Sequence, residues 1–232
     1  MPTWLFRGFT NTGPDDGWLF TCLGGDNTGD VIFHREIIRE AAQYGLYFSR
    51  DNMLIDTSRG DPVPAPEETI APMSDAQVAR LRVMPREKML QRVVTRESRG
   101  FRPGFIDADL PGCGAELAPV IGAGLTQNRD HVAPITNPHG FSIEWLRMAP
   151  GTQVSPFSLD DKMVLILREG ALRLVLNDEG DVTIDLKPWD TYSIPAGVTR
   201  RIEAARERGS ALDAGGFVAP VEVLPNYAMA GE

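Results

Sequence analysis

Histidine and cysteine, two residue types that often carry out chemistry in proteins, are scarce in this chain and form no recognisable site. The three histidines, His34, His131 and His139, include no His-x-His pair. Asp130 precedes His131 directly, but isolated loop histidines are usually solvated or structural groups. The chain has no Gly-x-Ser-x-Gly elbow, and its glycine-rich segment 24–30 lacks the lysine of a phosphate loop. The sequence therefore indicates no nucleophile, no acid–base pair and no phosphate-binding loop.

Composition narrows the class of protein further. At 232 residues the chain is long enough for a barrel with an attached subdomain. Its formal net charge is -9 and it has no dense block of lysine or arginine, which disfavours nucleic acid and anionic membranes as partners. The two cysteines, Cys22 and Cys113, have neither metal-like nor redox-like spacing. We therefore expect reduced thiols in a soluble cytoplasmic protein.

The first hundred residues predict short paired strands followed by helices. Alternating apolar groups and turn residues in 1–31 predict a two-stranded ribbon. An apolar stripe predicts a helix over 36–44, and Ser74 with Gln77 resembles a capping box that opens a second short helix. The prolines in 60–72 indicate a connector. A further helix is expected to carry four apolar side chains on one face, namely Met89, Leu90, Val93 and Val94.

From Phe101 onward the helical period disappears and short strands are expected. Each candidate is rich in β-branched or apolar residues and is bounded by Gly, Pro, Asn or Asp. The candidate strands are 141–148, 163–167, 172–176, 182–186 and 191–194. Regular short strands of this kind indicate a barrel or sandwich. The chain is thus expected to be mainly β, with an N-terminal strand and helix extension.

Two segments of this β-rich region have the spacing of a known family. The first runs from Gly151 through Phe157, Leu159 and Met163 to Gly170, and the second from Trp189 through Pro195-Ala196-Gly197 to Arg200. Together they resemble the two motifs of the cupin superfamily, whose fold is an RmlC-like jelly-roll β-barrel. In that family the corresponding slots hold His, His, Glu and His, so the chain resembles a degenerate member that lacks every metal ligand.

The resemblance implies where a site would lie. The four replaced ligands would point into the barrel, so Phe157, Leu159, Met163 and Arg200 are expected to line it. Three apolar side chains and one guanidinium provide no usual first shell for Fe, Mn, Ni or Zn. We therefore predict no metal and no other cofactor. Arg200 would bind a carboxylate or similar anion, or else pair with a local acid, Glu144, Asp160 or Asp161, in a barrel filled by its own side chains.

The predicted organisation has three parts. Residues 1–60 form a strand-pair and helix extension, 61–103 a proline-rich connector with helices, and 104–225 the barrel. Residues 2–9 repeat the proline-to-arginine offset of 195–202, which suggests the remnant of an ancestor with two cupin units. The first strands would then pair with an exposed sheet edge in the same chain or in a partner.

Several functions stay open at this point. One is a metal-free binding or accessory protein for a small organic acid. Another is a metal-independent isomerase, cyclase or lyase in which Arg200, Tyr192 and Glu144 act in the cavity. A third is metal-dependent dioxygenase chemistry, so the sequence does not decide whether the protein is an enzyme. Strand 163–167 is apolar on both faces, which favours coverage by the helices or by a second subunit and hence a homodimer, formed by sheet packing or N-terminal strand exchange.

Overall fold

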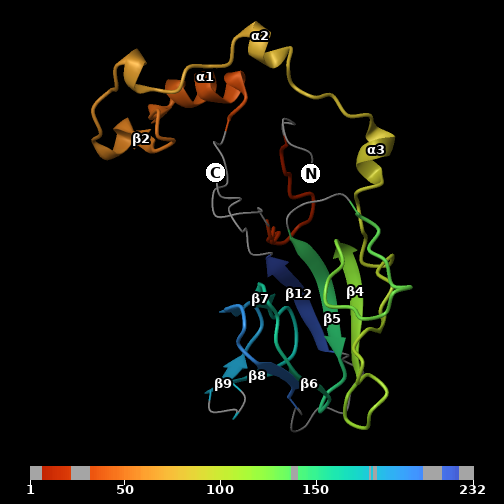
Figure 1. Ribbon diagram of the computed structural model, residues 1–232. Helices are drawn as coiled ribbons and strands as arrows, with labels where there is room; N and C mark the ends of the chain where they lie inside the picture. The colour runs from red at the N-terminus through yellow and green to blue at the C-terminus, as the bar shows by residue number, and fades with distance from the viewer. Residues whose placement is uncertain are drawn as a thin grey trace, which may run out of the picture. The chain divides into compact units, whose positions relative to one another are not determined.

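A computed structural model describes residues 7–21, 32–136, 141–177, 179 and 182–205, together with the backbone of 216–224. Its internal contacts divide the chain into two compact units, residues 1–91 and 92–232. The first unit carries the helices, and the second carries the large sheets (Figure 1).

The first unit combines short helices with one small antiparallel sheet. Helix α1 begins after His34, whose Nδ1 accepts a hydrogen bond from the Glu36 amide, and it packs on strand β1 (Figure 1). The capping box predicted at Ser74 and Gln77 is present and opens α2. The elements of this unit are α1 (Arg35–Gln43), β1 (Leu46–Phe48), β2 (Leu54–Asp56), two 3-10 turns (Thr57–Arg59 and Pro66–Glu68), α2 (Asp75–Val78) and α3 (Arg86–Leu90).

Two predictions for this part of the chain need correction. Residues 7–21, the described part of the expected ribbon, are exposed and form no strand, and the strand pair lies instead at β1 and β2. A two-stranded ribbon without a packing surface is marginally stable, which accounts for the difference. Helix α3 ends at Leu90, so Val93 and Val94 are not helical. Two adjacent β-branched residues followed by Thr95 disfavour continuation of the helix.

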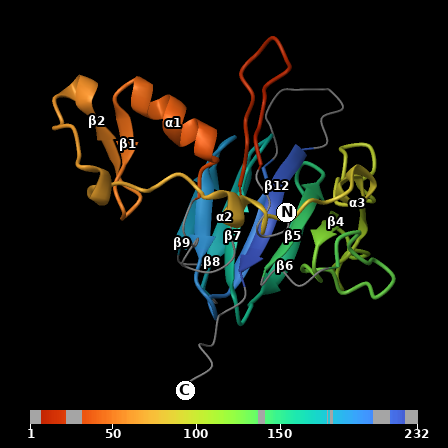
Figure 2. The ribbon, with the colours of Figure 1, turned by 90° about the horizontal axis from the view of Figure 1, so that it is seen from above.

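The second unit contains a six-stranded and a four-stranded antiparallel sheet. The six-stranded sheet has the order β10-β7-β12-β5-β4-β3, and the four-stranded sheet the order β6-β11-β8-β9. The strands are β3 (Arg102–Pro103), β4 (Ala115–Ile121), β5 (Ser142–Met148), β6 (Gln153–Phe157), β7 (Lys162–Ile166), β8 (Leu172–Leu176), β9 (Val182–Leu186), β10 (Thr191–Ile194), β11 (Arg200–Ala204) and β12 (Gly216–Leu224). Figures 1 and 2 show β12 between β5 and β7 in two views.

The strand order confirms the predicted jelly roll. Strand β5 pairs with β12, β6 with β11, β7 with β10, and β8 with β9, all antiparallel. Such nested pairing is that of one long hairpin rolled into two facing sheets, which is the jelly-roll arrangement. The five predicted strands correspond to β5, β7, β8, β9 and β10, and all eight strands of the roll lie within residues 104–225.

The facing sheets enclose an apolar core. Alternate residues of β5 are buried, so that Glu144, Leu146 and Met148 share the inner face of the sheet. Their neighbours come from both sheets, including Leu165 on β7 and Leu174 on β8, which are fully buried. Burial of this apolar surface is the main favourable term in the folding of the barrel. Among the described residues, two charged side chains, those of Glu144 and Arg200, are 0% exposed.

Candidate functional site

The four positions that correspond to cupin metal ligands come together at one end of the β6–β11 pair. Phe157 on β6 is the register partner of Arg200 on β11, and the guanidinium carbon of Arg200 lies 5.7 Å from the centre of the Phe157 ring. Nη1 of Arg200 lies 3.7 Å from the Met163 sulfur on β7. The Leu159 carbonyl accepts a hydrogen bond of 2.7 Å from the amide of Gly197, three residues before Arg200. Phe157 and Met163 therefore lie beside the Arg200 guanidinium, and the backbone of Leu159 is tied to the turn that precedes Arg200.

Arg200 is held by the backbone and not by a carboxylate. Its Nε donates to the Val198 carbonyl at 3.0 Å, and its Nη2 donates to the carbonyls of Val198 and Pro195 at 2.7 and 3.1 Å. Within the described residues it makes no ion pair, so the expected alternative partners, Glu144 and two aspartates, do not supply one there. Desolvation by burial lowers the pKa of Arg200 from its ordinary value. Among the described residues, backbone carbonyl dipoles are thus the groups that hold this buried positive charge.

The side chains around Arg200 differ in their exposure. Met163 is fully buried, whereas Phe157, Leu159 and Tyr192 are half-buried and pack against the core. Tyr192 lies on β10, opposite Leu165 of β7 in the sheet register. Of the two apolar side chains beside Arg200, Met163 is closed to solvent and Phe157 is partly open to it.

A transition metal does not fit these four positions. Metal-binding cupins use nitrogen and carboxylate donors there, but this chain offers two hydrocarbon side chains, one thioether and one guanidinium. A guanidinium has no lone pair to donate and repels a cation. In the part of the chain that the structure describes, no cluster of three or more His, Cys, Asp or Glu residues could replace them.

Glu144 lies on the inner face of β5, and the structure gives it a partner other than Arg200. Its Oε1 accepts a hydrogen bond from the Leu125 amide, and its Oε2 is buried without a hydrogen-bond partner among the described residues. Desolvation raises the pKa of this carboxyl to about 8, against a smaller lowering effect of the Leu125 amide. Glu144 is therefore largely protonated and neutral at pH 7.

The loop after β4 encloses the Glu144 carboxyl. Gly124 has a φ of +65°, and a Cβ on this residue would lie 2.5 Å from the Glu144 Oε2. Only glycine adopts this backbone conformation readily and leaves the space that the carboxyl occupies. This contact was not predicted from the sequence, where a Gly-x-Gly between Ile121 and Leu125 was the one available signal.

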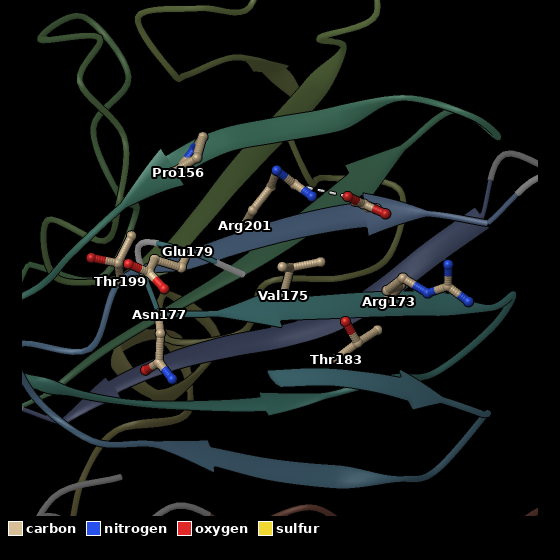
Figure 3. Close-up of a pocket in the computed structure, with 9 residues that line it drawn as sticks. Pro156, Arg173, Val175, Asn177, Glu179, Thr183, Thr199 and Arg201 are labelled. Carbon is tan, nitrogen blue, oxygen red and sulfur yellow. Dashed lines mark hydrogen bonds and ion pairs between the residues drawn. The ribbon is translucent and has the colours of Figure 1, made fainter. Parts of the chain in front are cut away.

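A pocket of about 260 Å³ lies on the outer face of the four-stranded sheet (Figure 3). Its arginines are already paired with acids of the same face, since Arg201 contacts Glu203 at 2.8 Å and Arg173 contacts Asp185 at 2.7 Å. The dashed line in Figure 3 marks the first of these ion pairs. This surface is charge-balanced, and it does not include any of the motif positions.

Comparisons with known proteins found cupins among solved structures only. No family model and no curated protein matches the chain. KdgF from Halomonas sp. has a TM-score of 0.38 and 9% identity over 56% of this chain and 92% of its own. The DMSP lyase DddQ from Ruegeria pomeroyi has a TM-score of 0.41 and 15% identity over 58% of this chain and 60% of its own. An RmlC-like cupin protein from Methanocaldococcus jannaschii has a TM-score of 0.32 and 18% identity over 39% of this chain and 74% of its own.

The strand order, taken with the two spaced motifs, is decisive for the fold. The second unit is a cupin-type jelly roll. With so few identical residues and such TM-scores, the likeness says nothing about what this protein binds or does. No helix among the described residues has the length and apolar character needed to cross a membrane.

Proposed function

We propose that this protein is a metal-free cupin that binds a small organic anion at Arg200. The observation that supports the proposal most strongly is a fully buried guanidinium that has no ion pair within the described residues. A buried charge that lacks a counter-charge is costly, and an anionic ligand would supply one. Nε and Nη2 already donate to backbone carbonyls, so Nη1, which lies 3.7 Å from the Met163 sulfur, is the nitrogen left to donate to a carboxylate.

The neighbours of Arg200 favour a carboxylate attached to an apolar group. Phe157 offers hydrocarbon surface beside the cation, and since Phe157 and Leu159 are half-buried, movement of these two side chains would admit a ligand. Glu144 would not repel an anion near neutral pH, because its pKa of about 8 keeps it mostly uncharged. Tyr192, half-buried on β10, is a further candidate to donate a hydrogen bond to the ligand.

A ligand screen with matched variants tests the proposal. We expect a subset of small aromatic and branched-chain carboxylic acids to raise the melting temperature of the wild-type protein, and their amides to have no effect. Arg200→Met keeps most of the side-chain volume and removes the charge, so it should abolish the stabilisation by the acids. Arg201→Met removes the adjacent cation, which lies half-buried in the outer pocket beside Glu203, and should leave the stabilisation intact.

Two results would contradict the proposal. One is that no acid stabilises the wild-type protein at millimolar concentration. The other is that an acid stabilises a folded Arg200→Met variant as strongly as the wild type. Should Arg200→Met fail to fold, Arg200→Lys provides the same comparison, since it keeps the charge but loses the planar donors and should weaken binding.

Metal-independent lyase, isomerase or cyclase activity is the second candidate, and Glu144 is the observation that favours it. A carboxyl with a pKa of about 8 holds a proton at neutral pH and is suited to act as a general acid. Its Oε2 has no hydrogen-bond partner among the described residues. The ligand acids identified by the screen would be the substrates to test, with chemical turnover lost in Glu144→Gln.

The homodimer and the cytoplasmic location remain predictions. Strand β7 does not by itself call for a second subunit, because Ile166 on its outer face is only 8% exposed and Val164 is half-buried within the single chain. Cys113 is a free thiol 3.8 Å from the Ser155 hydroxyl, and Cys22 lies outside the described residues.

A further inference from the structure

A second pocket, of about 240 Å³, lies outside the barrel. Its lining includes hydrogen-bond donors and a hydrogen-bond acceptor that have no partner among the described residues. The segment 94–102 forms one wall, and Pro119 of β4 with residues 130–134 form the other. Its polar lining includes Arg99 and His131. Neither residue belongs to the motifs or to the barrel interior.

Arg99 supplies hydrogen-bond donors that nothing in the described chain uses. Its guanidinium carbon lies 3.8 Å from the centre of the Trp145 ring, so the cation stacks on the outer face of β5. Stacking covers one face of the guanidinium and fixes its plane, but it does not satisfy the N–H groups. Both Nε and Nη1 are buried and have no hydrogen-bond partner among the described residues. Buried donors of this kind are costly unless a ligand or water pairs with them.

The surroundings of Arg99 are electropositive. Desolvation lowers the pKa of Arg99 most, and the charges of Arg168 and Arg96 lower it further, against a smaller opposing effect of Glu97. Arg168 contacts Glu169 at 3.3 Å, which offsets part of its charge. Three guanidinium groups thus lie within electrostatic range of one another. An anion paired with Arg99 would offset this repulsion, and a dianion would do so more than a monoanion.

His131 supplies the complementary group, a hydrogen-bond acceptor. Its side chain is 9% exposed, and its Nε2 lies 2.7 Å from the Gly100 carbonyl oxygen. A carbonyl can only accept, so Nε2 carries the proton and donates it. In the neutral ring Nδ1 is then a bare acceptor, and this buried atom has no hydrogen-bond partner in the described chain. The backbone at Gly100 therefore determines which nitrogen is available to a ligand.

We infer that this pocket binds a small oxyanion that also carries a hydroxyl group, and that the ligand is hydrogen phosphate. Its charged oxygens would accept from Arg99 at Nε or at Nη1, which face different edges of the guanidinium, and its hydroxyl would donate to Nδ1 of His131. The double negative charge matches the neighbouring arginines better than a hydroxycarboxylate, which carries the same two functions with one charge. Asp130 also lines the pocket, but it is exposed, so solvent screens its repulsion.

A pocket with both the Arg99 donors and the His131 acceptor should distinguish between ligands of similar size. Near pH 8, above the usual range in which histidine side chains ionise, hydrogen phosphate keeps one hydroxyl while sulfate has none. Titration calorimetry of the full chain at constant ionic strength should therefore show phosphate binding about tenfold more tightly than sulfate, the factor expected for one hydrogen bond. Glycolate, with a hydroxyl and a single charge, should bind more weakly than phosphate.

Three variants test whether Arg99 binds the anion and whether His131 accepts the hydrogen bond from its hydroxyl. Arg99→Met should abolish binding of phosphate and sulfate alike, and Arg129→Met, which removes an exposed arginine outside the pocket, should leave both unchanged. His131→Leu removes the Nδ1 acceptor, so it should bring the affinity for phosphate down to that for sulfate, while retained sulfate binding reports that the pocket is intact. If Arg99→Met does not fold, Arg99→Lys serves instead and should weaken phosphate binding about tenfold.

The inference is wrong if phosphate does not bind the wild-type protein at millimolar concentration, or if phosphate and sulfate bind equally well. It is also wrong if glycolate binds more tightly than phosphate, since the pocket would then recognise a hydroxycarboxylate. Unchanged phosphate affinity in a folded Arg99 variant would place the anion elsewhere on the molecule.

Discussion

We expect the wild-type protein to lose stability as the pH rises from about 4.5 to about 8. Replacement of Glu144 by glutamine should remove this loss. Glu144 is fully buried, and desolvation raises its pKa from 4.5 to about 8. In this pH range the carboxyl is protonated in the folded protein and ionised in the unfolded chain. Unfolding then releases a proton, so the free energy of unfolding falls by about 1.4 kcal/mol for each pH unit as pH rises.

Glutamine has nearly the same shape and cannot ionise. Its amide oxygen can still accept from the Leu125 amide, so the variant should match the wild type near pH 4.5 and exceed its stability by several kcal/mol near pH 8. Urea unfolding at one-unit pH intervals measures the difference. Glu40→Gln changes an exposed glutamate and serves as the control. Parallel pH profiles for the wild type and Glu144→Gln would mean that the carboxyl is not buried as described.

The second large effect is expected from Gly124→Ala. The new Cβ would lie 2.5 Å from Oε2 and 2.8 Å from Cδ of Glu144, a side chain that is fully buried and cannot swing away. Overpacking of this kind costs about 1–3 kcal/mol, and the left-handed φ of +65° adds about 1–2 kcal/mol of backbone strain. We expect a total loss of roughly 2–5 kcal/mol in the free energy of unfolding.

Gly112→Ala is the matched control for Gly124→Ala. Gly112 has a φ of +82°, but a Cβ there would meet nothing within 4 Å, so this variant measures the backbone strain alone. In a Glu144→Ala background the clash disappears, and the cost of Gly124→Ala should fall to that of Gly112→Ala. A cost that is the same in both backgrounds would show that the loop does not press on the carboxyl.

The parts of the fold that follow from local chemistry could be predicted from the sequence. Strands β8, β9 and β10 coincide with runs of Leu, Val, Ile, Thr and Tyr between turn residues. Strand β4 escaped prediction because its segment Ala115–Ile121 contains Pro119 and lacks regular alternation. It forms because β5 supplies a partner along its length, which is a tertiary effect that no local pattern encodes.

The candidate site could likewise be predicted from the sequence only in part. Motif spacing placed Phe157, Leu159, Met163 and Arg200 in one region, and in the structure Phe157 and Met163 lie beside Arg200 while the Leu159 carbonyl accepts from the Gly197 amide. Glu144 was considered as a partner of Arg200, but its hydrogen bond goes to the Leu125 amide, in a loop whose path depends on tertiary packing. The Arg99 and His131 pocket could not be foreseen, because it joins two irregular segments about thirty residues apart.

The central claim is that an arginine and apolar side chains occupy the metal-ligand positions of a cupin barrel. Elemental analysis of the purified full chain, after gel filtration without chelator, tests it most directly. The claim predicts far less than one equivalent of iron, manganese, nickel, copper or zinc per chain, with no stabilisation when these ions are added. One equivalent of a transition metal that stays with the folded protein and is lost on mutation of the barrel interior would contradict it.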